Sequence, residues 1–131
     1  MKYLLLVGHA ALPEGLEGAL TMLLGARPFV LACGMRDGTS VSDYRAELAK
    51  RIAPITSQDQ VVVLGDISGG SPLKNALVAL DDKGLGEQVM VFGGANLAMA
   101  ISAVMGIDDG LDMDAIRDAM LMEGSQAVRQ V

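Results

Sequence analysis

Four short apolar runs, each followed directly by glycine, most constrain what this chain of 131 residues can fold into. The runs are continuous rather than alternating, which is typical of strands that are buried on both faces of a sheet. They span Tyr3–Val7, Phe29–Cys33, Val61–Leu64 and Val89–Phe92. We therefore expect four buried strands.

Between and after these runs, apolar residues recur with the period of an amphipathic helix, as at Leu16, Leu20 and Leu23. The same spacing follows over 44–52, 73–80, 97–105 and 113–120. Strands that alternate with helices predict a parallel sheet covered by helices on both faces. We expect one α/β domain over residues 1–131, a doubly wound, flavodoxin-like sheet with strand order 2-1-3-4.

The last residues of the chain fit two structures. Ser125–Val131 either continues the final helix or forms a short extra strand, since alternate residues such as Gln126 and Val128 would share one face. Both readings stay open from the residues alone.

Composition narrows the classes of function. The net charge is −6, and Lys50-Arg51 is the only basic pair, which argues against nucleic-acid binding. One histidine and one cysteine argue against a zinc site within the chain, and Cys33 is expected to be a small buried apolar residue. The apolar runs are too short to cross a membrane, so we expect a cytoplasmic protein.

The candidate site lies where parallel strands end, because ligands of such sheets bind beyond the carboxyl ends of the strands. His9 follows the first run, Asp66 follows the third, and the segment 93–96 follows the fourth. If the first and third strands are neighbours, His9 and Asp66 face each other. One imidazole nitrogen can then react, while the carboxylate binds the other nitrogen and fixes the tautomer of the ring. The simpler alternative is a strand-end histidine that only bonds a loop.

The residues after Asp66 predict an anion site. Gly69 and Gly70 allow close approach of the backbone, Ser71 is a good N-cap, and Pro72 is a good first helical residue. The free amides at this helix start attract an anion. A nucleophile, an acid and an anion cradle together predict phosphoryl transfer through a phosphohistidine. The chain has neither GxxxxGK[ST] nor GxGxxG, so no nucleotide cofactor is expected.

These residues also resemble a known family. Gly8-His9, the segment GDISGGSP over 65–72 and the segment GGANL over 93–97 are similar to the EIIA domain of the mannose family, a component of the bacterial sugar phosphotransferase system. The resemblance covers nearly the whole chain. It implies a cytoplasmic phosphocarrier in which His9 carries the phosphoryl group and Asp66 and Ser71 serve the site.

The resemblance also implies partners. The carrier protein HPr would donate the phosphoryl group, and a separate EIIB protein would accept it for sugar uptake, so that the membrane is reached only through permease components. The family implies a homodimer with an exchanged C-terminal strand, for which residues 126–131 would serve.

Some positions depart from the family pattern. Gly8 stands where threonine or serine is frequent, Ala10 where glycine is frequent, Ile67-Ser68 where an aromatic residue is common, and Ala98 where proline is common. The sugar and the partners are therefore left open. Two other roles fit the same chemistry, a phosphoryl-transfer subunit of a dihydroxyacetone kinase and a regulatory phosphoprotein. A flavin-binding module is weaker, because the chain has few aromatic residues.

Overall fold

The sheet has the strand order that the sequence predicts. The computed structural model describes the whole chain, residues 1–131. Its strands β1 (Lys2–His9), β2 (Val30–Met35), β3 (Gln60–Gly65) and β4 (Val89–Phe92) are all parallel, in the order β2-β1-β3-β4. The central strands β1 and β3 carry the most deeply buried apolar runs, Leu4–Leu6 and Val61–Leu64. Continuous apolar runs are needed there because helices cover both faces.

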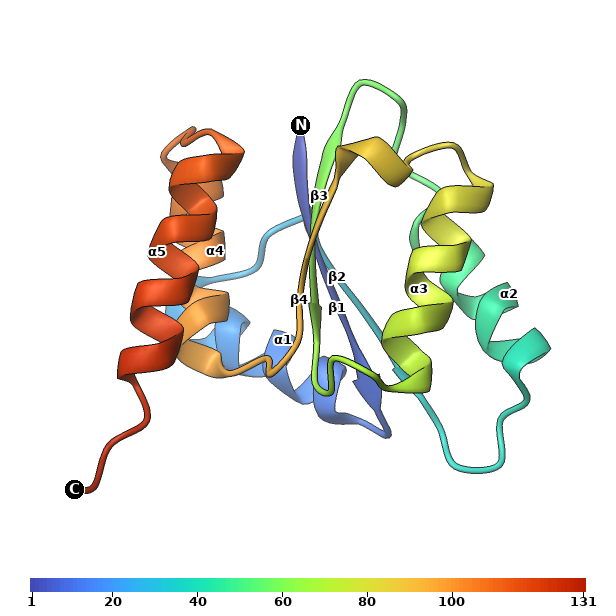
Figure 1. The fold of residues 1–131 in the computed structure, drawn as a ribbon, viewed down its shortest axis with the longest axis horizontal. Coiled ribbons are helices and arrows are strands. Elements are labelled where there is room, and N and C mark those ends of the chain that lie inside the picture. The colour runs from blue at the N-terminus through green and yellow to red at the C-terminus, as the bar shows by residue number, and fades with distance from the viewer.

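The helices divide between the two faces of the sheet, as Figure 1 shows. Helices α1 (Leu12–Leu24) and α4 (Leu97–Asp108) pack on one face, and α2 (Val41–Arg51) and α3 (Ser71–Asp82) pack on the other. Helix α5 (Met113–Gln126) lies against α4, outside this layer, and a 3₁₀ turn, η1 (Gly86–Gln88), leads into β4. No helix is both long and apolar enough to cross a membrane.

Side-chain caps fix where several helices begin. Ser40 accepts a hydrogen bond from the backbone N–H of Asp43 at the start of α2, and Asn96 accepts one from Met99 at the start of α4, both at 3.0 Å. Each cap satisfies a backbone donor that the helix itself leaves unpaired. The loops before α2 and α4 therefore end at defined residues beside the sheet.

Of the two structures that the sequence allows for the C-terminal residues, continuation of the final helix is found for part of the segment. Helix α5 continues through Gln126, and residues 127–131 have no regular secondary structure. Figure 1 shows this end pointing away from the body of the molecule, and Val128 and Val131 are exposed. No strand forms there within the single chain, and exchange of this segment between two subunits stays a prediction.

Cys33 is a buried core residue, as expected. It lies in β2, and its backbone carbonyl accepts a 2.6 Å hydrogen bond from the buried hydroxyl of Tyr44 on α2. Burial, with smaller contributions from neighbouring acids, raises the pKa of the Cys33 thiol to about 11. The thiol is therefore protonated at neutral pH, which removes it as a candidate nucleophile.

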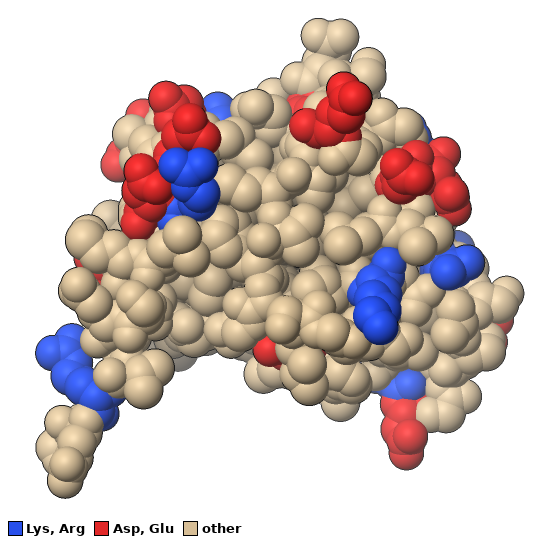
Figure 2. All heavy atoms as spheres, viewed as in Figure 1, with Lys and Arg blue, Asp and Glu red and all other residues tan.

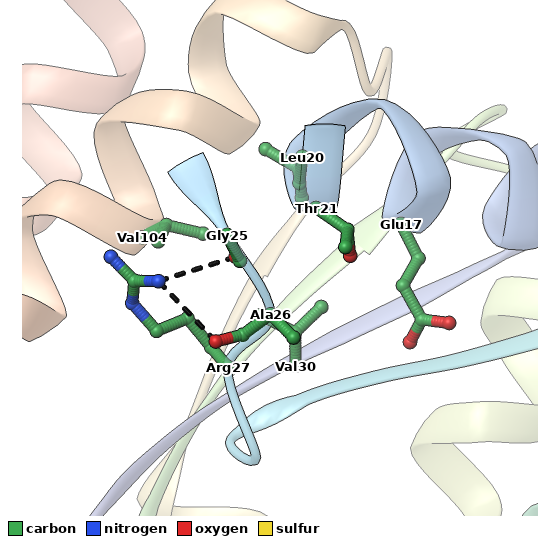
Figure 3. Close-up of a pocket in the computed structure, with 8 residues that line it drawn as sticks. All are labelled: Glu17, Leu20, Thr21, Gly25, Ala26, Arg27, Val30 and Val104. Carbon is green, nitrogen blue, oxygen red and sulfur yellow. Dashed lines mark hydrogen bonds between the residues drawn. The ribbon is translucent and has the colours of Figure 1, made fainter. Parts of the chain in front are cut away.

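Arg27 lies at the edge of the molecule opposite the carboxyl ends of the strands. It lines a pocket of about 210 Å³ between the end of α1, the start of β2 and α4 (Figure 3). Its Nη1 donates to the carbonyls of Leu24, Gly25 and Ala26, while Nε and Nη2 bind Asp108 at the end of α4, the latter at 2.9 Å. One guanidinium thus satisfies carbonyls at the end of α1 and ties this helix to α4.

Replacing Arg27 with methionine should lower the melting temperature by a few degrees, because both the cap of α1 and the pair with Asp108 are lost. The hydrogen bond from Arg27 holds the pKa of Asp108 below its usual range. The pair therefore stabilises the fold above the unfolded pKa of about 3.9, and this contribution is lost as pH falls through the lower folded pKa. The difference in melting temperature between the wild type and Arg27→Met should be largest near neutral pH and shrink in acid.

The matched control is Arg117→Met, since Arg117 pairs with Asp114 and Asp118 on the exposed surface of α5. Thermal unfolding followed by circular dichroism measures both variants. An Arg27→Met shift no larger than that of the control would contradict the assigned role.

Candidate functional site

The sheet register brings His9 and Asp66 to one edge. Val7 on β1 pairs with Gly65 on β3, so both chains leave the sheet side by side. The Asp66 carboxylate then accepts three hydrogen bonds. His9 gives its backbone N–H to Oδ2 at 2.8 Å and its ring Nδ1 lies 2.9 Å from the same oxygen, while the Ile67 N–H donates to Oδ1 at 2.8 Å.

This contact decides which ring nitrogen of His9 is available. Burial of the Asp66 carboxyl raises its pKa, but the hydrogen bonds from His9 and Ile67 outweigh burial, and the pKa lies below its usual range. The ionised carboxylate can only accept, so the proton of the imidazole resides on Nδ1. Nε2 then carries a lone pair, and the His9 side chain is 53% exposed. The site presents an oriented nucleophilic nitrogen to solvent.

Two glycines leave room for this pair. A Cβ at Gly8 would lie 2.9 Å from Cγ and Oδ2 of Asp66, and a Cβ at Gly70 would lie 3.2 Å from Cε1 of the His9 ring. The departure from the family pattern at position 8 thus has a physical counterpart, because a threonine there would collide with the carboxylate in this arrangement. Gly70 lets the turn before α3 lie directly against the ring.

The turn after His9 is backbone-strained. Ala10 has φ = 52°, in the left-handed region that glycine enters far more easily than alanine. Its N–H donates to the carbonyl of Met35 at 2.9 Å, and its own carbonyl passes so close to Gly34 that a Cβ there would be only 1.9 Å away. The chain crosses the end of β2 here, which requires the glycine at position 34, while the positive φ explains why a glycine would suit position 10. Strain of this kind is frequent beside functional residues.

The loop after β4 holds the backbone of Asp66 from the other side. The N–H groups of Gly94 and Ala95 donate to the carbonyls of Asp66 and Gly65 at 3.1 and 3.0 Å. A Cβ at Gly93 would lie 2.5 Å from Cβ of Ser68, so the two loops are in direct contact. The segment 93–96 therefore belongs to the site as a support for Asp66.

The start of α3 differs by one residue from the expectation. Gly70, with an extended backbone, is the N-cap, and Ser71 is the first helical residue, followed by Pro72. Ser71 is therefore already inside the helix and cannot act as its N-cap, and its Oγ instead accepts a 3.0 Å hydrogen bond from Nδ2 of Asn75. Gly69, Gly70 and Ser71 follow one another at the turn into α3, and Gly70 is placed directly against the His9 ring.

This turn offers free backbone donors. The N–H groups of Gly69, Ser71 and Leu73 donate to no acceptor of the protein, and Pro72 has none to offer. Unpaired amides at the positive end of a helix form an anion site. Because Gly70 touches the ring, this anion site and the His9 ring are immediate neighbours.

Two residues of this region were missed by the sequence reasoning. Asn75 is 5% exposed, and its Oδ1 accepts a 2.8 Å hydrogen bond from Nε of Arg45 on α2. The available signal was a polar residue within the apolar face of α3, one helical turn after Ser71. A periodicity that counts only apolar positions does not register it.

Comparison with known proteins shows where this arrangement recurs. The family model EIIA-man, described as the PTS system fructose IIA component, matches residues 3–121. No curated protein matches the chain.

Solved structures match over nearly the full length. The phosphotransferase system component EIIA from Streptococcus agalactiae has a TM-score of 0.83 at 22% identity, covering 99% of this chain and 97% of that chain. The mannose/sorbose specific IIA subunit from Enterococcus faecalis has a TM-score of 0.78 at 26% identity, covering 100% and 96%. A PTS IIA protein associated with the fucose utilization operon of Streptococcus pneumoniae has a TM-score of 0.80 at 17% identity, covering 98% and 92%.

The strain at Ala10 gives a stability prediction. Ala10→Gly should raise the free energy of unfolding by up to about 1 kcal/mol, because relief of the left-handed strain exceeds the entropy that glycine adds to the unfolded chain. The control Ala46→Gly, at an exposed position inside α2, should lower it by about 1 kcal/mol. Urea unfolding measures both, and a loss of stability in both variants would show that Ala10 is not strained.

The contact of Asp66 with His9 gives a spectroscopic prediction. In Asp66→Asn, a single carbonyl oxygen cannot accept from all three donors, so the neutral ring should shift from the Nδ1–H form toward the Nε2–H form. Long-range ¹H–¹⁵N correlation spectra of His9 report the tautomer directly. Asp37→Asn removes an exposed, unpaired carboxylate from the loop after β2 and should leave the spectrum unchanged. An unchanged tautomer in Asp66→Asn would contradict the assignment of Nε2 as the free nitrogen.

Proposed function

The chain belongs to the EIIA-man family of phosphotransferase-system components, and from this premise we propose that it carries a phosphoryl group on Nε2 of His9. The observation that carries the proposal is the 2.9 Å contact of Nδ1 with Asp66, which leaves Nε2 unpaired and exposed. The free amides at the start of α3, beside the ring, support it. The family makes the chain a phosphocarrier of this system, and the proposal names the atom.

The transfer is a substitution at phosphorus. The lone pair of Nε2 attacks the phosphorus of phosphorylated HPr, and the bond between phosphorus and the HPr nitrogen breaks, with its electron pair returning to HPr. The His9 ring keeps its Nδ1 proton and becomes positively charged, which the ionised Asp66 stabilises. The amides of Gly69, Ser71 and Leu73 would receive the phosphoryl oxygens. A nucleophile on EIIB then attacks phosphorus, and the bond to Nε2 breaks.

The openness of the site supports a protein as the donor. His9 is not enclosed, and the pockets of the molecule are lined by other residues. Two apolar side chains at the same edge of the sheet, Leu12 at the start of α1 and Ile67 directly after Asp66, are 54% and 57% exposed. Exposed apolar residues around a reactive group suit contact with a second protein surface. HPr and EIIB are the partners we propose.

The distribution of charge supports an anionic group at this edge. The net charge is −6, yet Arg36, Arg45 and Lys74 lie at the end of β2, on α2 and in the first turn of α3, all near the carboxyl edge of the sheet. Figure 2 shows most acidic side chains of the viewed face toward the end where the strands begin, whereas the basic side chains are spread over α5, the C-terminal tail, α2 and α3. Glu14, Asp37 and Asp43 lie at the same edge and Arg36 pairs with Glu14, so Arg45 and Lys74 are the cations there that no carboxylate neutralises by a direct ion pair.

We include a cytoplasmic homodimer in the proposal. The exposed segment 127–131 has no regular structure and projects from the body, so it is free to exchange with a second copy. In this arrangement the short strand expected from the alternating tail would form only between subunits.

His9→Ala should abolish phosphorylation, because the chain has no other histidine. The measurement is intact mass after incubation with phosphoenolpyruvate, enzyme I and HPr of the same organism. The wild type should gain one acid-labile phosphoryl group, and Thr21→Ala, a change near the opposite edge of the sheet, should gain it equally. Label on His9→Ala would move the site elsewhere. An unlabelled wild type beside labelled HPr would exclude HPr as the donor.

The acceptor is tested in the same assay. Phosphorylated protein mixed with EIIB of the same organism should return to its original mass while EIIB gains the group. Transfer only to a dihydroxyacetone kinase subunit would show that the protein serves that kinase and not sugar uptake. Transfer to neither protein would favour a regulatory phosphoprotein.

A further inference from the structure

We propose that Asn75 and Arg45 are positioning residues that aim the hydroxyl proton of Ser71 at the phosphoryl group. This inference rests on the proposed phosphoryl transfer at His9 and deepens it. Neither residue lies at the strand ends where the site was expected, and they reach the site through a chain of two hydrogen bonds.

The first bond fixes the amide of Asn75. A guanidinium can only donate, so the atom that meets Nε of Arg45 at 2.8 Å must be the amide oxygen Oδ1. The amino group Nδ2 therefore points the other way, toward the start of α3. Because Asn75 is buried at 5% exposure, water does not compete freely for either end.

The second bond fixes the hydroxyl of Ser71. Nδ2 of Asn75 donates to the backbone carbonyl of Ser71 at 2.9 Å and to its Oγ at 3.0 Å. An Oγ that already accepts has one remaining proton to give. That proton meets no acceptor of the protein, since the only hydrogen bond of the hydroxyl is the one from Asn75. Ser71 therefore presents a ready donor at the exposed start of α3.

The position of this donor matches the chemistry of His9. Ser71 follows Gly70, whose backbone lies against Cε1 of the ring, the atom bonded to Nε2. The hydroxyl thus joins the free amides of Gly69, Ser71 and Leu73. Without Asn75, the hydroxyl has no partner within the protein and is free to rotate away from this direction.

Arg45 is available for this role because nothing else engages it. It forms no ion pair with any carboxylate, and its side chain is otherwise exposed. Its bond to Asn75 is therefore not a by-product of a surface salt bridge. Lysine at this position would keep a donor and the charge, whereas methionine would keep neither.

The predicted readout is the pKa of the phosphoryl group on His9. A donor stabilises the dianion and lowers this pKa, so loss of the donor raises it. Ser71→Ala should raise it by about 0.5–1 unit. Asn75→Leu, which matches the volume and adds no charge, should raise it by a similar amount, and Arg45→Met by less. Arg45→Lys should restore most of the wild-type value.

The experiment loads His9 with potassium phosphoramidate. Nε2 attacks phosphorus, the phosphorus–nitrogen bond of the reagent breaks, and ammonia leaves, so no protein partner is required. ³¹P NMR titration then gives the phosphoryl pKa in each variant, and circular dichroism checks the fold. Arg45→Met, a surface change, keeps the test valid if Asn75→Leu does not fold.

Repeating the substitutions in the Ser71→Ala background separates the effect of the two hydrogen bonds that link Arg45, Asn75 and Ser71 from the effect of charge. Asn75→Leu should have no further effect there, because the hydroxyl it orients is gone. Lys74→Met removes an exposed charge from the same helix start and should act equally in both backgrounds. Equal effects of Asn75→Leu in both backgrounds, or none in either, would overturn the proposal.

The outcome also separates this inference from the proposed function. If phosphoramidate loads His9 but HPr does not label it, the proposed donor is rejected, and the ³¹P titration still tests the roles of Asn75 and Arg45. A wild-type His9 that phosphoramidate fails to load would contradict the free Nε2 and would overturn both.

Discussion

The site depends on one carboxylate that accepts three hydrogen bonds. Asp66 binds the backbone and the ring of His9 together with the backbone of Ile67. Hydrogen bonds to the charged form outweigh the cost of burying it, so the group stays ionised where an isolated buried acid would take up a proton. Its charge fixes the tautomer of the ring, its Oδ2 holds the backbone of the strand end that carries the ring, and its Oδ1 holds the backbone of Ile67.

Much of the surrounding backbone follows from keeping this contact intact. The carboxylate needs the space left by Gly8, and the ring needs the space left by Gly70. The chain can leave β1 toward α1 only through the left-handed turn at Ala10, which passes over Gly34. The loop after β4 then holds the Asp66 backbone. Small residues here are a consequence of close packing around two polar side chains, and not of flexibility.

The sequence was sufficient for the sheet and for the pair at its edge. Apolar runs ending in glycine located all four strands, and the parallel order placed His9 beside Asp66. It was insufficient for the first residue of α3 and for contacts between helices. Ser71 is a residue type that favours the N-cap, yet the helix begins at Ser71 itself, Gly70 is the N-cap, and the Ser71 hydroxyl binds Asn75. Arg45 belongs to another helix, and no local pattern links it to α3.

The tail is a different case. Whether residues 127–131 form a strand depends on a surface that a single chain does not supply, so neither periodicity nor the isolated fold decides it. Local propensity is a weak guide whenever the pairing partner is another molecule.

The separation of His9 and Asp66 along the chain has a consequence for biosynthesis. They are 57 residues apart, His9 at the end of β1 and Asp66 directly after β3, and these strands pair only after the intervening β2 and α2 have been made. A nascent or cleaved chain that ends before β3 contains the histidine but not the carboxylate that selects its tautomer. The tautomer of the imidazole is therefore a property of the assembled β1–β3 ladder, and His9 gains its oriented, unpaired Nε2 only once the central sheet has formed.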